Sequence, residues 1–237
     1  MTFHIITLFP DIFSSYLNES ILGRAIKDKK IKVNYYNIRD FVRPTKTQSK
    51  NKKPYLRVDD KPYGGGAGMV LQAEPILKAV EAAKKKIKGK AKVVLFSAKG
   101  KQFDQKAAYD YSKKYKDIIL ITGRYEGIDE RVADILKAEE ISIGPYVLTD
   151  GDIAASVVVS AISRLIPGVI RLESLQEESH WNLILKKEKD KTLGENGLEY
   201  PHYTRPEVFE WKGKKYKVPK VLLSGNHKLI DEWRKNK

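Results

Sequence analysis

The sequence predicts an α/β protein whose mostly parallel sheet is covered by helices on both faces. Short apolar runs typical of strands alternate with segments in which apolar residues recur at helical spacing, and glycine-bearing loops follow three of the strands. A chain of 237 residues can bury a sizeable core. In proteins built this way, ligands bind in loops at the carboxyl ends of the strands.

Apolar alternation and β-branched runs predict five strands. In chain order they are Thr2 to Phe9, Ile31 to Ile38, Ala91 to Ser97, Ile118 to Thr122, and a strand that ends near Ile141 and Ile143. Between and after these strands, apolar residues recur at helical spacing and predict five helices. Pro10-Asp11 is the start signal for the first of them. The first helix carries Ile12, Tyr16, Leu17, Ile21 and Ala25, and the next two span Pro75 to Ile87 and Phe103 to Tyr115. The fourth is capped or begun by Asp129 and ends near Leu136. The fifth begins at Asp152 and carries Ile153, Val157, Ala161 and Leu165.

A change of pattern after Ile166 predicts two domains. Pro167-Gly168 ends the long helix, and the acidic string LESLQEES that follows lacks clear periodicity, as a linker does. The sequence then becomes basic and ends in a helix expected from about Asn226. We therefore expect a large domain over residues 1–168, a linker over 169–178, and a small, mainly helical domain over 179–237.

The charge of the chain indicates a polyanionic partner. The formal net charge is +15 and the isoelectric point is near 9.6, so nucleic acid is the leading candidate. Lysine-rich composition can also be a general property of an organism's proteins, and position is more informative. One acid-free loop, from Arg43 to Arg57, combines basic residues with Tyr55, and Lys212, Lys214 and Lys215 lie between Trp211 and Tyr216. Basic residues interleaved with aromatic ones suit RNA.

Several classes of function are excluded by what the sequence lacks. There is no cysteine, which excludes thiol nucleophiles, disulfides and cysteine-ligated zinc. No apolar run approaches the roughly 18 residues that span a bilayer, and the N-terminus does not resemble an export signal, so we expect a cytoplasmic protein. The four histidines are too scattered to predict a metal site. The string KPYGGGAGM matches no nucleotide-binding glycine motif, which argues against nucleoside triphosphates.

Three glycine-bearing loops follow successive strands. They are Ser97 to Gly100, Gly123 to Gly127, and the loop within ISIGPYVLTDGDIAA, Ile141 to Ala155. Taken alone, the last is explained slightly better as an ordinary strand-to-helix connection than as a ligand site. Because parallel strands bring such loops to one edge of the sheet, the three together favour a ligand site.

Collinear strings along nearly the whole chain resemble the bacterial tRNA (guanine-N(1))-methyltransferase family. They are PYGGGAGM, GRYEGIDERV, SIGPYVLTDGDIAA, SRLIPGV, HYTRPEV and VLLSGNH. The resemblance implies a homodimer that shares its active site between subunits. It also implies the SPOUT fold with a C-terminal trefoil knot, S-adenosyl-L-methionine as the cofactor, and methylation of the guanosine 3′ of the anticodon (position 37) in tRNA.

The resemblance also assigns residues to roles. It implies that the three loops bind the cofactor through Ser97, Ala98, Gly100, Gly123, Tyr125, Glu126, Ile143, Gly144, Pro145, Tyr146, Val147, Leu148 and Gly151. Two of these positions differ from the family pattern, because Ala98 stands where proline is common and Pro145 where aspartate is usual. In the same third loop, Asp150 stands where glycine is usual.

The same resemblance implies the catalytic residues. Glu178 stands where the family has an aspartate as general base, and Arg164 matches an arginine that stabilises negative charge on the guanine O6. We expect the anticodon stem-loop to contact Arg205, Lys212, Lys214 and Lys215, and we expect no metal. Judged without the resemblance, Glu178 is a solvated linker acid and Arg164 a surface ion-pair partner. The alternative from another class is a non-catalytic RNA-binding or ribosome-assembly protein, which explains the lysines but leaves the three loops unexplained.

Overall fold

The computed structural model describes residues 1–42, 56–171, 174–175 and 200–236, and it divides into two compact units, Met1–Ile170 and Arg171–Lys237. The first unit contains a five-stranded sheet in the order β2-β1-β6-β5-β7, and every neighbouring pair is parallel. The strands are β1 (Thr2–Thr7), β2 (Lys32–Asn37), β5 (Ala91–Gln102), β6 (Asp117–Ile121) and β7 (Glu139–Ser142), and a separate antiparallel pair joins β3 (Asp59–Asp60) to β4 (Val70–Leu71). The predicted parallel sheet is confirmed.

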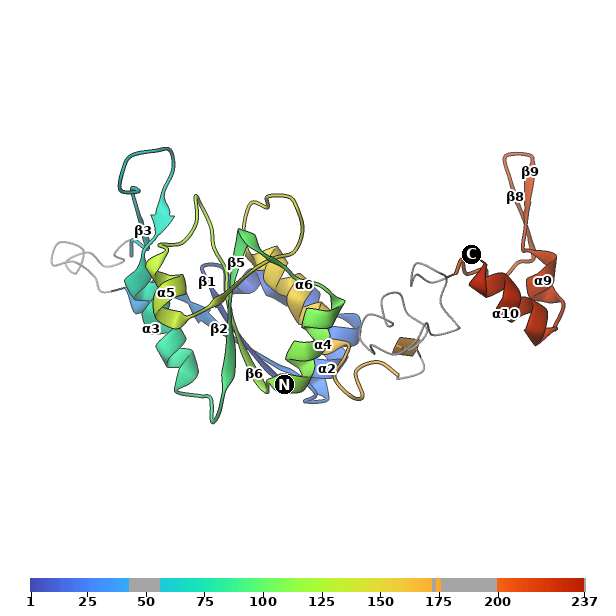
Figure 1. Cartoon of the computed structure of the whole chain (residues 1–237), viewed down its shortest axis with the longest axis horizontal. Coiled ribbons are helices and arrows are strands. Elements are labelled where there is room, and N and C mark those ends of the chain that lie inside the picture. The colour runs from blue at the N-terminus through green and yellow to red at the C-terminus, as the bar shows by residue number, and fades with distance from the viewer. Residues whose placement is uncertain (43–55, 172–173, 176–199, 237) are drawn as a thin grey trace. The chain divides into compact units, whose positions relative to one another are not determined.

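Helices cover both faces of this sheet, as predicted (Figure 1). One face carries α3 (Ala73–Lys84) and α5 (Arg131–Leu136), and the other carries α2 (Ser20–Lys27), α4 (Gln105–Lys114) and α6 (Asp152–Ser163). Short helical segments complete the unit: η1 (Pro10–Phe13), α1 (Ser14–Leu17) and η2 (Ile38–Phe41). Within the described residues, no helix combines the length and the apolar character needed to cross a membrane.

The core follows from the alternation of side chains along the strands. In β6, Ile119 and Ile121 are fully buried in the cluster that includes Ile76 and Val80 of α3. Their neighbours in the strand point to the opposite face because successive strand residues alternate, and Leu120 is fully buried there as well. A parallel strand covered on both sides therefore carries an unbroken apolar run, DIILI in this case.

Two predicted elements were wrong in extent. The first helix was predicted as one segment, but the structure divides it into η1, α1 and α2, and Ser20, the first residue of α2, has a positive φ of 50°. The strand predicted to stop at Ser97 continues to Gln102 in β5. Phe96 and Lys101 both pair with Ile141, so residues 97–100 leave the ladder as a bulge. Apolar periodicity cannot reveal either a left-handed residue or a bulge.

The apolar residues expected along α6 do not all face the core. Ile153 is 51% exposed and Val157 is 42% exposed, whereas Val158 and Ile162 on another side of the helix are fully buried. Nearly every position of α6 is apolar or small, so spacing could not distinguish its buried side. The result is a pair of exposed apolar side chains one helical turn apart.

The second unit is less helical than predicted. Its described part contains the antiparallel hairpin of β8 (Val208–Trp211) and β9 (Lys214–Lys217) and two helices, α9 (Lys220–Leu223) and α10 (His227–Lys235). Asn226 caps α10, with its side-chain oxygen accepting the backbone N–H of Leu229, so the helix expected from about Asn226 is confirmed. Of the basic loop in the first unit, residues 43–55 lie outside the described residues, and Arg57 pairs with Asp59 and Asp60.

A buried histidine makes the stability of the sheet sensitive to acid. His4 in β1 is 1% exposed and lies between the Tyr36 hydroxyl, 3.1 Å from Nδ1, and the Asp117 carboxylate, 3.2 Å from Nε2. Burial lowers the pKa of His4 below its ordinary value of 6.5, and the hydrogen bond to Asp117 only partly opposes this shift. The folded protein therefore holds His4 neutral.

We predict that the first unit loses stability as the pH falls below about 6.5, because the unfolded chain then binds a proton that folded His4 binds only at lower pH. Denaturant unfolding between pH 7 and pH 5 measures this loss. His4→Gln should make stability depend less steeply on pH. The control is His227→Gln at the exposed start of α10, which should retain the wild-type dependence. An unchanged slope in His4→Gln would contradict the prediction.

Candidate functional site

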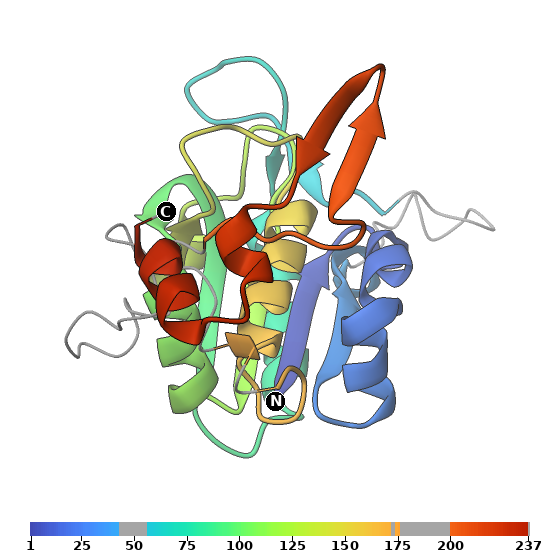
Figure 2. The same ribbon diagram turned by 90° about the vertical axis from the view of Figure 1, so that its right-hand side faces the viewer.

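A pocket of about 500 Å³ lies at the carboxyl ends of β5, β6 and β7. The segments that follow these three strands rise from the same edge of the sheet, as both views show (Figures 1 and 2). Ten of the thirteen predicted loop residues line the pocket: Ser97, Ala98, Gly123, Tyr125, Glu126, Ile143, Tyr146, Val147, Leu148 and Gly151. The structure therefore brings the three predicted loops together around one cavity.

Three of the predicted loop residues do not line the pocket. Gly100 lies in the β5 bulge, where an added Cβ would be 2.6 Å from the Glu140 carbonyl carbon, so it permits close approach of β7. Gly144 lies beneath the ring of Tyr146, and Pro145 lies between the two. The Tyr146 hydroxyl donates to the Ile143 carbonyl at 3.1 Å. Gly100 and Gly144 thus shape the loops without lining the cavity themselves.

A solvent-exposed ion pair forms part of the pocket lining. Lys99, in the β5 bulge, donates to Glu130 at the start of α5 at 2.7 Å and lies 3.8 Å from Glu140 of β7. The hydrogen bond with Glu130 raises the pKa of Lys99, so the lysine stays protonated. All three residues line the cavity. The pair therefore links the first loop to the elements on either side of it.

The second loop is supported by the end of the glycine-rich segment. The Glu126 amide donates to the Met69 carbonyl, and Leu71 exchanges backbone hydrogen bonds with Gly127 and Asp129, all at 3.0 Å. Asp129 also accepts from Arg131 at the first turn of α5, which lowers the pKa of Asp129. The N-cap of α5 is Glu130, so the prediction that Asp129 caps or begins the helix is off by one residue; Asp129 supports the helix start by accepting the backbone N–H of Arg131. The string GGGAGM leads into the backbone contacts that support the second loop.

The second and third loops meet at Gly151. Its amide donates to the Gly123 carbonyl at 2.9 Å, and a Cβ at this position would lie 2.9 Å from the Gly123 backbone nitrogen. No real Cβ tolerates that distance from backbone, so only glycine fits without moving one of the two loops. This contact fixes the start of α6 against the end of β6.

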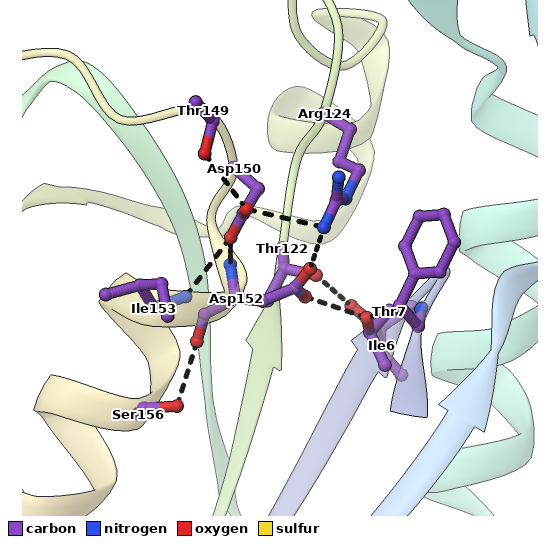
Figure 3. A network of polar contacts seen from close by, with 10 residues as sticks. Ile6, Thr7, Thr122, Arg124, Thr149, Asp150, Asp152, Ile153 and Ser156 are labelled. Atoms are coloured by element: carbon purple, nitrogen blue, oxygen red, sulfur yellow. Dashed lines mark hydrogen bonds and ion pairs between the residues drawn. The ribbon is translucent and has the colours of Figure 1, made fainter. Parts of the chain in front are cut away.

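Beneath this contact lies a buried charged network (Figure 3). Asp152, the first residue of α6, is completely buried and accepts from the Thr7 hydroxyl at 2.7 Å and from Arg124 Nη2 at 3.3 Å. The same Arg124 nitrogen donates to Asp150 at 3.3 Å, and the guanidinium carbon lies 4.3 Å from the centre of the Phe9 ring. One arginine thus joins the end of β1, the second loop and the third loop.

Asp150 has a role that glycine, the residue usual at this position in the family, could not fill. Its Oδ1 accepts the backbone N–H groups of Asp152 and Ile153, at 2.9 Å and 3.3 Å, and so satisfies two free donors at the start of α6. Its other oxygen faces Arg124. Where the family usually has glycine, this chain has a helix cap and an additional charge in the network.

Sequence reasoning missed Arg124, Asp152, Thr7 and Glu130 as parts of the site. An acidic residue in the first turn of a helix is a common start signal, so Asp152 could have been singled out. Nothing in the sequence indicated that Arg124 would pair with it, because the two are 28 residues apart and meet only through the order of the strands. That pairing required the tertiary structure.

The remaining predicted residues are not among those that line the pocket. Glu178 falls outside them. Arg164 is the C-cap of α6, at the opposite end of the helix from Gly151. Arg205, Lys212, Lys214 and Lys215 are exposed residues of the second unit. In the part of the chain that the structure describes, no three histidine, aspartate or glutamate side chains are placed to hold a metal ion.

Together the fold and the site define a parallel-sheet α/β protein with a loop-built ligand pocket, followed by a basic second unit. The sequence as a whole, residues 1–237, matches the family described as tRNA (Guanine-1)-methyltransferase TrmD, and the chain belongs to that family. A tRNA (guanine-N(1)-)-methyltransferase of Clostridioides difficile is 48% identical over 99% of this chain and 91% of its own. Those of Carboxydothermus hydrogenoformans and Buchnera aphidicola are 46% and 45% identical, over 99% and 98% of this chain and 81% and 87% of their own. The resemblance read from the sequence is confirmed.

We predict that Asp152→Ala lowers the free energy of unfolding by about 3–5 kcal/mol, because it leaves the Thr7 hydroxyl and the Arg124 guanidinium without their buried acceptor. Chemical denaturation measures the change. The control is Thr149→Ala, which removes an exposed hydroxyl 3.2 Å from Asp150 and should cost less than about 1 kcal/mol. Equal effects of the two substitutions would mean that the buried network does not stabilise the fold.

Proposed function

We propose that this chain transfers a methyl group from S-adenosyl-L-methionine to N(1) of the guanosine 3′ of the anticodon, position 37, in tRNA. The observation that carries the proposal is a pocket built by the family's three loops in a chain that matches this methyltransferase family over its whole length. The relatives named above are called tRNA (guanine-N(1)-)-methyltransferases, which supports methylation of a tRNA guanine at N(1). The net charge of +15 suits a tRNA substrate.

The residues of the pocket fit the proposed cofactor. The cavity of about 500 Å³ is in the size range of small-molecule sites. Apolar side chains such as Ile143 and Leu148 suit an adenine ring, and exposed backbone around Gly123 and Tyr125 suits the polar parts of the molecule. Glu126 adds a carboxylate for an ammonium or a ribose hydroxyl. When bound, S-adenosyl-L-methionine supplies an activated methyl group. The chain's own task is to hold guanine in line with that group and to take up the N(1) proton.

We assign proton removal to Glu178 and electrostatic stabilisation to Arg164. The Glu178 carboxylate takes the proton from N(1) as the new nitrogen–carbon bond forms, and the Arg164 guanidinium stabilises negative charge on the guanine O6. The arm of glutamate is one methylene longer than that of the aspartate usual in the family. The extra methylene changes the distance that the carboxylate can reach from its backbone.

The position of Arg164 supports an active site shared between two subunits. α6 spans 12 residues, so at about 1.5 Å per residue its ends are roughly 18 Å apart, with Gly151 at the pocket end and Arg164 at the other. In a homodimer, Arg164 can serve the pocket of the partner. The exposed Ile153 and Val157 on α6 offer an apolar surface for that contact. The trefoil knot of the SPOUT fold belongs to the same proposal, supported by the family match over residues 1–237.

The activity is tested by incubating the chain with unmodified tRNA and labelled S-adenosyl-L-methionine and then identifying the methylated nucleoside. We expect 1-methylguanosine, lost when guanosine 37 is replaced by adenosine. A chain that binds tRNA but transfers no methyl group would instead be the non-catalytic RNA-binding protein of the alternative. A methyl group on another position would contradict the assigned substrate.

We predict that Glu178→Gln lowers kcat by about 100-fold to 10,000-fold, the usual contribution of a general base, with little change in cofactor affinity. The glutamine keeps the size of the side chain and cannot accept the proton. Single-turnover methyl transfer and cofactor titration measure the two effects. The control is Glu177→Gln, the neighbouring acid, which should retain activity; the reverse result would transfer the role to Glu177.

We further predict that neutralising Arg205, Lys212, Lys214 and Lys215 together to glutamine weakens tRNA binding and reduces its logarithmic salt dependence by roughly 3, about 0.7–0.9 per lost phosphate contact. S-adenosyl-L-methionine affinity should not change. The control neutralises an equal number of exposed lysines in and after α3, Lys84, Lys85, Lys88 and Lys90. If only the control variant loses tRNA affinity, the second unit is not the RNA-binding element.

A further inference from the structure

The hairpin of the second unit separates its side chains into two different faces. Opposed residues of an antiparallel pair point to the same side. The register pairs Phe209 with Tyr216 and Trp211 with Lys214, so one face carries three aromatic rings and a lysine. The other face carries Val208, Glu210, Lys215 and Lys217.

The turn fixes this arrangement. Lys212 and Gly213 form a two-residue loop with φ of 48° and 76°, the positive pair of a type I′ turn, whose twist matches that of the strands. A lysine in the first position is unusual, because asparagine or aspartate is preferred there. This places a cationic side chain at the tip of the hairpin.

The aromatic face is open to solvent. Phe209 is 52% exposed, Trp211 is 59% exposed and Tyr216 is 55% exposed. The rings of Phe209 and Trp211 are within 14° of parallel, with centroids 6.3 Å apart. The two rings therefore present nearly parallel, solvent-exposed surfaces of the kind on which bases stack.

The charges around the rings favour an anionic partner. The hairpin carries Lys212, Lys214, Lys215 and Lys217 against one acid, Glu210. Glu210 lies on the opposite face from the rings, 3.9 Å from Lys215. The aromatic face thus has Lys214 beside it and no carboxylate of the hairpin on it.

We propose that the aromatic face of the β8–β9 hairpin, Phe209, Trp211 and Tyr216, is a stacking platform for unpaired nucleotides of the RNA substrate, with Lys214 contacting the adjoining phosphate. Stacking needs only the flat face of a base and so tolerates any sequence. This inference goes beyond the phosphate contacts proposed above and rests on the proposed RNA substrate, but it does not depend on methyl transfer.

A purely structural role would explain part of the arrangement. An aromatic cross-strand pair such as Phe209 and Tyr216 stabilises an isolated hairpin, which is otherwise marginal. Trp211 is the most exposed of the three and faces Lys214 across the strands, not a ring. Trp211 is therefore the residue whose loss distinguishes stacking from hairpin stability.

The test measures binding of the full chain to two labelled RNAs by fluorescence anisotropy at several salt concentrations. One is an oligo-uridine of about eight nucleotides, and the other is a duplex with the same number of phosphates. Trp211→Leu keeps apolar bulk but removes the flat ring. It should weaken oligo-uridine binding by roughly 5-fold to 150-fold, the range for one stacked base, without changing the salt slope, and should leave duplex binding unchanged.

Two matched variants complete the design. Trp211→Phe retains a ring and should recover most of the affinity, and Val208→Ala, an apolar truncation on the opposite face, should behave as wild type. Circular dichroism verifies the fold of each. Equal loss on both RNAs, no loss, or a change of oligomeric state in Trp211→Leu would overturn the proposal. A wild-type chain that shows the predicted stacking but transfers no methyl group would refute only the proposed function.

Discussion

The buried carboxylate of Asp152 is the constraint on which the site depends. A fully buried charge is costly unless it is paired, and the partners of Asp152 come from two other parts of the chain, Thr7 at the end of β1 and Arg124 after β6. The start of α6 therefore cannot move without leaving a charge unpaired. Because the third loop ends at that point, its course is tied to the sheet.

This constraint explains how three loops can form a defined cavity. The Gly151 amide and the ion pair of Arg124 with Asp150 hold the third loop to the second. Backbone hydrogen bonds to Met69 and Leu71 support the second loop, and the Lys99 ion pair joins the first loop to α5. Hydrogen bonds and packing around a site hold the residues that contact a ligand in place before the ligand binds. The glycines contribute by letting backbone approach backbone at Gly100 and Gly151.

Sequence reasoning recovered the framework and the placement of the loops. Parallel strands, helices on both faces and the convergence of three loops followed from periodicity and from the rule that strand ends meet at one edge. The β5 bulge and the break at Ser20 were missed because both depend on backbone conformation that apolar spacing does not encode. The pairing of Arg124 with Asp152 and the aromatic face of the hairpin were missed because each depends on register. The exposed side of α6 was missed because the helix is apolar on nearly every side.

The central claim is that the meeting of the second and third loops at Gly151 creates the cofactor pocket. Isothermal titration calorimetry with S-adenosyl-L-methionine tests it most directly, on the wild-type chain and on Gly151→Val. The account predicts one binding site per chain in the wild type and its loss in a folded Gly151→Val variant, because the valine side chain would force the Gly123 backbone away. Absence of binding to the wild type, or undiminished binding to the variant, would contradict it.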